Sequence, residues 1–397
     1  MRLTVKKVAL MDSWILVATA LVIFMSIPGV ALFYGGLVSS KNVVSVLTQS
    51  IALVGVVTIT LLVAGNAIMG SGFNITAISD GFMLLGAGQE GLESTIFGFT
   101  FAIITPILIL GGFAERVKLP FVFIFSALWT LVVYCPFAYW VWGQPDDSLL
   151  TLAGTFGHAY DWAGGIVVHQ AAGVAALVLA IVIGSRKGFG KSVPHNPTMV
   201  FLGASVLWVG WFGFNAGLND GLANAGHMIM NTHVAAATAA LVWPLFEAIR
   251  GGKPTLVGAA TGAVAGLVAI TPACHEVAAA GAFILGIAAG IIPQLAVGLV
   301  KSTLKIDDSL DVFAVHGVAG IVGTLLMPFL MFGAANSGAA VVFIDQLAAV
   351  VISLIYNVIV TAILAYVLKF TIGMRVDDAT EEEGLDITAH GERGYNL

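Results

Sequence analysis

Eleven long apolar runs dominate this sequence of 397 residues. A helix that crosses a bilayer needs about 20 consecutive, mostly apolar residues. The runs of about this length are 13–34, 43–66, 95–114, 120–142, 162–184, 198–217, 226–249, 255–273, 279–300, 311–332 and 341–370. Their apolar residues are continuous rather than alternating, which favours helices over the strands of a membrane barrel. The sequence therefore predicts an all-α membrane protein with eleven transmembrane helices.

The composition excludes several other classes of protein. Hydrophobic residues make up 59% of the chain and charged residues 10%, against about 25% charged residues in a soluble domain. A soluble enzyme, a nucleic-acid-binding protein and a disordered chain are incompatible with these values. The two cysteines, Cys135 and Cys274, lie in separate apolar runs and form no disulfide framework or metal motif. Because no nucleophile–base pair or ATP-binding motif is apparent either, we expect neither an enzyme nor a bound metal or cofactor.

The basic residues predict the orientation in the membrane. If the C-terminus is cytoplasmic, 13 of the 16 Lys and Arg residues face the cytoplasm, while the loops at 67–94 and 143–161 contain none. The exceptions, Arg2, Lys6 and Lys7, precede the first span. Either residues 1–10 form a signal-like segment or translation starts at Met11. We expect a multi-pass protein of the cell membrane with its N-terminus outside and its C-terminus inside.

A basic loop at 185–197 divides the first ten spans into two groups of five. An odd number of spans in each group inverts the second relative to the first, as in transporters built from inverted repeats. We predict one transmembrane domain over 1–372, with inverted halves at about 12–184 and 198–332 and a long eleventh helix at about 341–370. The remaining 373–397 form a cytoplasmic tail.

Two histidines lie deep inside the predicted spans. His169 in the fifth and His316 in the tenth each follow a valine and precede a glycine by four residues. A two-fold axis in the membrane plane would bring these matched positions together, and ionisable residues at this depth usually serve a transport pathway. The alternative is a structural pair that hydrogen-bonds backbone carbonyls between packed helices. No third ligand lies at the same depth, so a zinc site is not predicted.

Acidic residues stand at the beginnings of the same two spans. Asp161 opens the fifth span, and Asp308 and Asp311 open the tenth. A carboxylate at a helix N-terminus accepts hydrogen bonds from free backbone amides and suits the helix dipole. We predict capping at all three positions, which at Asp161 is compatible with facing a cation. Asp345 in the eleventh run has no visible partner, and we assign it to a subunit interface.

Aromatic residues form a third group. Trp140 and Trp142 end the fourth span on the outer side, where they belong either to the interfacial aromatic belt or to a cation-recognition surface. Phe101 and Phe214 lie in the third and sixth spans. By position alone, these two are ordinary core residues.

Motifs along nearly the whole chain resemble those of the ammonium transporter/Rhesus family. They include Ala-Leu-Phe-Tyr-Gly-Gly-Leu-Val (31–38), Asp-Trp-Ala-Gly-Gly-Ile-Val-Val-His (161–169) and Trp-Val-Gly-Trp-Phe-Gly-Phe-Asn-Ala-Gly (208–217). Further similar segments are 41–42, 101–106, 111–116, 262–272, 307–317 and 384–395. They occur in family order from about residue 12 to the C-terminus, and the sequence is similar to microbial members in particular.

The resemblance implies a homotrimer with one pore in each subunit. It implies that Trp142 stacks on ammonium in an outer vestibule, which Asp161 shapes without contacting the ion. It further implies that Phe101 and Phe214 close the vestibule as stacked rings, with His169 and His316 lining the pore below as a hydrogen-bonded pair. By the same analogy, a cytoplasmic PII-type signalling protein is expected to bind the 185–197 loop and the tail.

One position departs from the family pattern. Many bacterial members carry a serine four residues after the gating phenylalanine, where its hydroxyl helps to bind ammonium. This chain has Leu218 there. Since an acceptor is lost, we expect weaker recruitment of the ion.

Desolvation indicates the form in which the substrate crosses. Moving a bare ion into hydrocarbon costs on the order of 20 kcal/mol, whereas one cation–π contact returns about 2 kcal/mol. We therefore expect ammonium to lose its proton near Phe101 and Phe214 and to pass the histidines as ammonia. Whether the proton follows through the pair, so that the net flux carries charge, is left open.

Two alternatives use the same scaffold. A non-conducting ammonium sensor is favoured by Leu218 and opposed by the lack of an output domain after residue 397. A Rhesus-like channel for ammonia or carbon dioxide is opposed by Trp142 and the paired phenylalanines.

Overall fold

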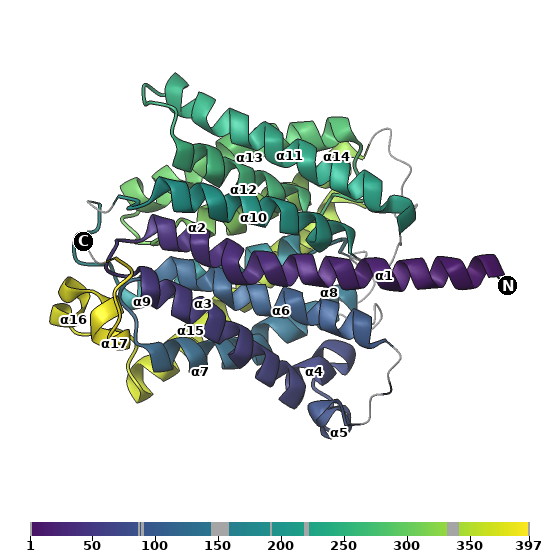
Figure 1. Ribbon diagram of the computed structural model, residues 1–397, viewed down its shortest axis with the longest axis horizontal. Helices are drawn as coiled ribbons and strands as arrows, with labels where there is room; N and C mark the ends of the chain where they lie inside the picture. Colours follow the sequence, from purple (N-terminus) through teal and green to yellow (C-terminus); the bar gives the residue numbers. More distant parts are fainter. Residues whose placement is uncertain are drawn as a thin grey trace.

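The computed structural model describes residues 2–85, 88, 91–143, 159–190, 193–217, 222–331 and 341–395. Within these ranges the chain forms helices and turns, with one isolated bridge between Val117 and Arg375. Most of the helices run side by side along one direction, and α1 projects beyond the others (Figure 1). The N-terminus and the two short helices of the tail lie at opposite ends of this bundle (Figure 1). The end that holds α16 and α17 is called the tail end below, and the opposite end is called the vestibule end.

The first half contains five long spans, several of which change pitch through a π-helical segment, η. Its elements are α1 (Arg2–Phe24), η1 (Met25–Gly29), α2 (Val30–Leu37), α3 (Val43–Thr60), η2 (Leu61–Gly65), α4 (Asn66–Ser71), α5 (Ile75–Asp80), η3 (Phe82–Leu84, a 3₁₀ turn), α6 (Leu92–Phe113), α7 (Leu119–Trp129), η4 (Thr130–Tyr134), α8 (Cys135–Trp142), η7 (Gly165–Gln170) and α9 (Ala171–Ile183).

The remaining chain supplies the other spans and the tail. Its elements are α10 (Pro197–Ala216), α11 (Leu222–Ile249), α12 (Leu256–Ile270), α13 (Ala279–Val297), η8 (Gly298–Thr303), η9 (Phe313–Val318), α14 (Ala319–Leu330), α15 (Phe343–Thr371), α16 (Asp378–Glu383) and α17 (Leu385–His390). The helices α10 to α14 form one side of the bundle, and α1 to α9 form the other (Figure 1).

Ten helical stretches in the described part of the chain are long and apolar enough to cross a membrane. The predicted all-α membrane fold is therefore confirmed, and the count of eleven spans stays a prediction. The difference lies at the predicted span 255–273, where α12 has only 15 residues. It begins at the cap of Thr255, whose hydroxyl accepts from the amide of Gly258 at 2.8 Å, and it gives way to buried turns over 271–277.

Two glycines allow the helices that carry the predicted histidines to cross in contact. A Cβ atom on Gly173 would lie 2.3 Å from the backbone nitrogen of Gly317. Since no side chain fits there, α9 and η9 touch backbone to backbone, one turn from His169 and next to His316. The chain has 47 glycines, and at these two a close helix crossing leaves no room for a side chain.

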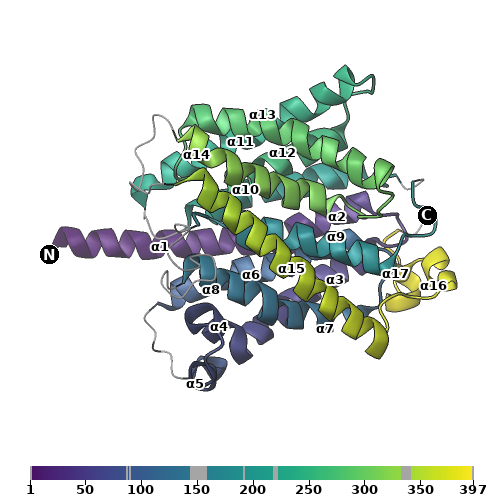
Figure 2. The ribbon, with the colours of Figure 1, turned by 180° about the vertical axis from the view of Figure 1, so that it is seen from behind.

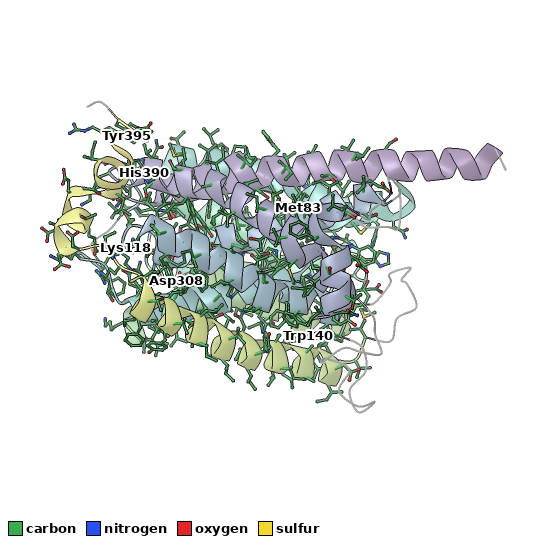
Figure 3. The ribbon with its side chains drawn as sticks, turned by 90° about the horizontal axis from the view of Figure 1, so that it is seen from below. Met83, Lys118, Trp140, Asp308, His390 and Tyr395 are labelled. Carbon is green, nitrogen blue, oxygen red and sulfur yellow. The ribbon has the colours of Figure 1, made fainter. Side chains whose placement is uncertain are left out.

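The last long helix, α15, crosses the other helices obliquely (Figure 2). It has 29 residues and packs against α7, α9 and α14. The tail then folds back onto the bundle, so that Lys118, His390 and Tyr395 lie at the same end (Figure 3). Asp386 accepts a hydrogen bond from the amide of Ser45 at 2.8 Å, which fixes α17 against α3.

Candidate transport pathway

Five side chains form an unbroken series of ring contacts from the vestibule end into the bundle. The rings of Trp142 and Phe101 meet edge to face at 5.9 Å, and those of Phe101 and Phe214 stack at 4.1 Å and 17°. Phe214 then contacts His169 at 5.8 Å, and His169 stacks on His316 at 5.4 Å. These residues come from α6, α8, α10, η7 and η9. The structure thus brings together five residues that are up to 215 positions apart in the sequence.

A cavity of about 580 Å³ opens at the vestibule end of this series. Its wall consists of Ile15, Ser94, Phe97, Gly98, Phe101, Val141, Trp142, Ala159, Tyr160, Asp161 and Trp162. Trp142 is 38% exposed, whereas Phe101 is 3% exposed and Phe214 is fully buried. Phe101 therefore lies in the buried part of the cavity wall, Phe214 is stacked behind it without lining the cavity, and the indole stands in the exposed part of the wall.

Asp161 is bound entirely to the backbone of the segment that it opens. Its carboxylate accepts four amide hydrogen bonds at 2.6–3.1 Å, from the consecutive residues 164, 165, 166 and 167. Its carbonyl oxygen accepts the indole N–H of Trp142 at 2.7 Å. Burial raises the pKa of Asp161, and the four amide bonds oppose this shift. Asp161 therefore shapes the cavity through the backbone and through Trp142.

The two histidines meet in the interior of the bundle. The Nδ1 atoms of His169 and His316 are 3.3 Å apart, so one ring nitrogen donates and the other accepts. His169 is fully buried and His316 is 3% exposed. The Nε2 atom of His169 makes no hydrogen bond to the protein. It is therefore free to bind a substrate or to exchange a proton.

At the tail end, Asp308 opens the segment that carries His316. Its Oδ2 atom accepts from the amide of Phe313 at 2.7 Å, while Oδ1 has no hydrogen-bond partner and the residue is 1% exposed. Burial, together with the nearby charge of Asp311, raises the pKa of Asp308 to about 7. Asp311, predicted to cap as well, instead pairs with Lys301 at 2.8 Å.

An ion-pair cluster joins the two histidine-bearing segments where they end, at the tail end of the bundle. Arg186, after α9, binds Asp307, before η9, at 2.7 Å, and it also pairs with Glu115. Burial alone would raise the pKa of both carboxylates, but Arg186, together with hydrogen bonds from Ser39 and Asn42 at Glu115 and the charge of Arg116 at Asp307, holds each pKa below its usual value. A cavity of about 640 Å³ lies beside this cluster. Its wall includes Arg186, Lys301, Lys305, Ser309 and Asp311.

Two groups of residues in this region were not predicted. The indole of Trp211 stacks on His169 at 5.1 Å and 17°. Glu276, fully buried, accepts from the hydroxyl of Tyr160 at 2.6 Å and pairs with His275 at 2.8 Å. Trp211 lies within the family-like motif 208–217, so the sequence held a signal for it. Glu276 lies three residues beyond the predicted limit of its span, which is why it escaped the search for ionisable groups in the membrane.

Two other predicted positions are less informative. Leu218 lies outside the described residues. Asp345 lies in the first turn of α15, where a negative charge suits the helix dipole. In the described part of the chain, no group of three or more His, Cys, Asp or Glu side chains is arranged to hold a metal ion.

The comparisons with known proteins agree with this architecture. The model of the Ammonium Transporter Family matches residues 13–395. The ammonium transporter of Aquifex aeolicus is 41% identical, with 97% of this chain and 93% of that protein covered. The ammonium transporter Amt1 of Archaeoglobus fulgidus is 38% identical, with 96% and 98% covered.

Solved structures are similar over the same length. The crystal structure of Candida albicans Mep2 has a TM-score of 0.83 and 30% identity, with 94% of this chain and 87% of that chain covered. A structure described as a sensor Amt protein has a TM-score of 0.86 and 26% identity, with 97% and 98% covered. This chain is a multi-pass membrane transporter, and it belongs to the ammonium transporter family.

Proposed function

We propose that this protein moves ammonium across the cell membrane through the series of rings that ends at the two histidines. Ammonium is recruited from outside at Trp142, whose indole face attracts a cation. The ion loses its proton at the stacked Phe101 and Phe214, because the pore beyond them is too apolar to solvate a charge. Ammonia then passes His169 and His316, which offer a hydrogen-bond donor and an acceptor.

The observation that carries this proposal is the continuity of the series from the cavity to His316. An aromatic belt alone would leave Trp142 without contact to Phe101, and purely structural histidines would have both ring nitrogens bonded. The proton released at the phenylalanines either returns outside or follows through the Nδ1 pair. Only the second route makes the flux electrogenic.

Ammonium-evoked current and uptake in proteoliposomes test the proposal. We expect the unchanged protein to conduct ammonium and exclude potassium. His169→Ala and His316→Ala should abolish proton-coupled current while the protein remains folded, because each histidine supplies the partner of the other. His169→Asp keeps an ionisable group, so it should retain conduction and admit potassium. Full ammonium current in both alanine variants would contradict the proposed role of the pair.

The non-conducting sensor remains the alternative, and the similarity to a sensor Amt protein is the observation that favours it. The same measurement separates the two, because a sensor binds ammonium without current or uptake. We also propose that Leu218 weakens recruitment. Leu218→Ser should then lower the half-saturating concentration, since a hydroxyl bonded to a charged donor contributes about 1.5–3 kcal/mol at best.

The assembly and the partner that we propose follow from membership of the family. We propose a homotrimer with external N-termini and cytoplasmic tails, built from halves 12–184 and 198–332 that are inverted repeats. Mass determination in detergent tests the trimer, and a stable monomer would contradict it. A PII-type protein is proposed to bind the 185–197 loop and the tail. A pull-down with ADP, ATP or 2-oxoglutarate tests this binding.

A further inference from the structure

The early end of α12 places a buried turn against the segment that carries His169. All of residues 271–277 are buried. Pro272 in this turn accepts a hydrogen bond from the amide of Trp162 at 3.3 Å. A Cβ atom on Gly165 would lie 2.7 Å from the ring of the same proline. The turn therefore supports η7 directly through Pro272. A helix that continued through residue 273 would not make these contacts in the same way.

The first residue of the turn also holds a ring that lies on His169. The indole N–H of Trp211 donates to the hydroxyl of Thr271 at 2.8 Å. That hydroxyl donates in turn to the carbonyl of Leu267 at 2.8 Å, so its direction is set by α12. Trp211 and Thr271 are both fully buried. Because a buried N–H left without an acceptor is costly, the indole is strongly biased toward this one placement.

We infer that Thr271 and Trp211 are positioning residues that orient the ring of His169 in the pathway. The inference rests on the proposed function and adds a role beyond it. The terminal torsion of a histidine is broad, and the bond between the two Nδ1 atoms leaves the ring free to tilt about it. The indole lies against the ring at 5.1 Å and 17°. It removes this freedom and keeps the unpartnered Nε2 atom pointing in one direction.

A second tryptophan–threonine pair supplies a matched control. Trp129 on α7 donates its indole N–H to the hydroxyl of Thr361 on α15 at 3.0 Å, and both residues are fully buried. The hydroxyl of Thr361 donates onward to Asn357 at 2.7 Å. The chemistry matches that of Thr271, but this pair contacts neither histidine. Thr361→Val therefore removes an equivalent indole bond whose link to η7 runs only through Asn357, which donates to the carbonyl of Ala171 at 2.7 Å, and not through a ring stacked on a histidine.

The test compares Thr271→Val, Thr271→Ser and Thr361→Val with the unchanged protein in proteoliposomes at equal protein density. Thr271→Val should lower the maximal ammonium flux by roughly threefold to tenfold, the factor expected when misplacing the ring costs about one hydrogen bond. The half-saturating concentration should stay the same, because recruitment occurs at Trp142 in the cavity. Thr271→Ser restores the hydroxyl and should restore the flux, and Thr361→Val should conduct normally.

Three results would overturn the inference. They are normal flux in Thr271→Val, an equal loss in Thr271→Ser, and an equal loss in Thr361→Val. An absence of current in the unchanged protein would instead refute the proposed conduction. In that case, ¹⁵N-histidine solid-state NMR still tests whether Thr271 and Trp211 orient the ring of His169. The imidazole signals, assigned with His169→Ala, should shift or broaden in Thr271→Val and remain unchanged in Thr361→Val, and unchanged signals in both variants would overturn the positioning role.

Discussion

Asp161 and Asp308 open the two histidine-bearing segments from opposite ends of the bundle, and they are held very differently. Both are buried, with 5% and 1% exposure. Asp161 accepts four backbone amides with its two oxygens. Asp308 accepts the amide of Phe313 with Oδ2, and its Oδ1 atom has no partner. The same residue type at equivalent positions therefore provides a rigid cap at one end and an ionisable group at the other.

The difference has a physical consequence for each end. Four amide donors satisfy a carboxylate in its charged form and fix the backbone beneath the cavity, so the geometry around Trp142 is rigid. A buried oxygen without a donor favours the protonated form, which explains why the pKa of Asp308 rises to about 7. The vestibule end is thus built for shape, whereas the tail end holds a carboxyl that changes its protonation near neutral pH.

Replacement by asparagine should show the largest difference between the two aspartates, measured as the loss of folding stability. Asp161→Asn leaves one oxygen for the four amides and turns an amide N–H₂ toward two of them. Since hydrogen bonds to a charged group contribute about 1.5–3 kcal/mol each, we expect a loss on the order of 3–6 kcal/mol. Asp308→Asn keeps an acceptor for Phe313, and its unpaired N–H₂ replaces a buried oxygen that is itself unpaired, so relative to protonated Asp308 we expect a loss of less than about 1 kcal/mol.

Thermal unfolding midpoints in detergent at pH 7 measure this contrast. Asp161→Asn should unfold far below the unchanged protein or fail to assemble, whereas Asp308→Asn should unfold at or above the midpoint of the unchanged protein, which by pH 7 has lost the stability linked to the Asp308 proton. Equal midpoints for the two variants would show that the number of amide donors does not set the difference.

How much of this could be predicted follows from the nature of each contact. The spans, the paired histidines and the cap at Asp161 were accessible because hydrophobic length, matched spacing and helix-terminus chemistry are local signals. The bond from Trp211 to Thr271 was not, because it joins residues 60 positions apart. The short α12 was also missed, since its apolar composition continues past Ile270 while its backbone does not. The protonation of Asp308 depends on burial and on donors that only the folded chain defines.

The stability difference between Asp308→Asn and the unchanged protein should depend on pH. Folded Asp308 keeps its proton up to about pH 7, whereas the unfolded chain releases it near 3.9, the usual value for aspartate. Folding therefore takes up a proton between these values, and the unchanged protein loses at most about 1.4 kcal/mol for each pH unit across this window. The asparagine variant lacks this proton, so its relative stability should rise from pH 4 to pH 7 and then level off.

Unfolding midpoints at pH 4, 5, 6, 7 and 8 test this dependence, with Asp80→Asn as the control at an exposed carboxylate. The midpoint of the control should differ from that of the unchanged protein by a nearly constant amount. A constant difference for Asp308→Asn as well would mean that Asp308 ionises at its ordinary value, and the contrast with Asp161 would then be purely structural.

The smallest expected effect concerns Asp311, whose charge adds to the raised pKa of Asp308. Asp311 has a φ of 63° and a partly exposed ion pair with Lys301. In Asp311→Gly, relief of the left-handed backbone, worth about 1 kcal/mol, offsets the lost ion pair, worth about 0–1 kcal/mol, so the midpoint at pH 4 should hardly change. The variant removes a negative charge near Asp308 and frees Lys301, and both effects favour the carboxylate. In the Asp311→Gly background, the stability difference between Asp308→Asn and the protein with Asp308 should therefore level off at a pH that is lower by a fraction of a unit. If this pH stays in place, burial alone sets the protonation of Asp308.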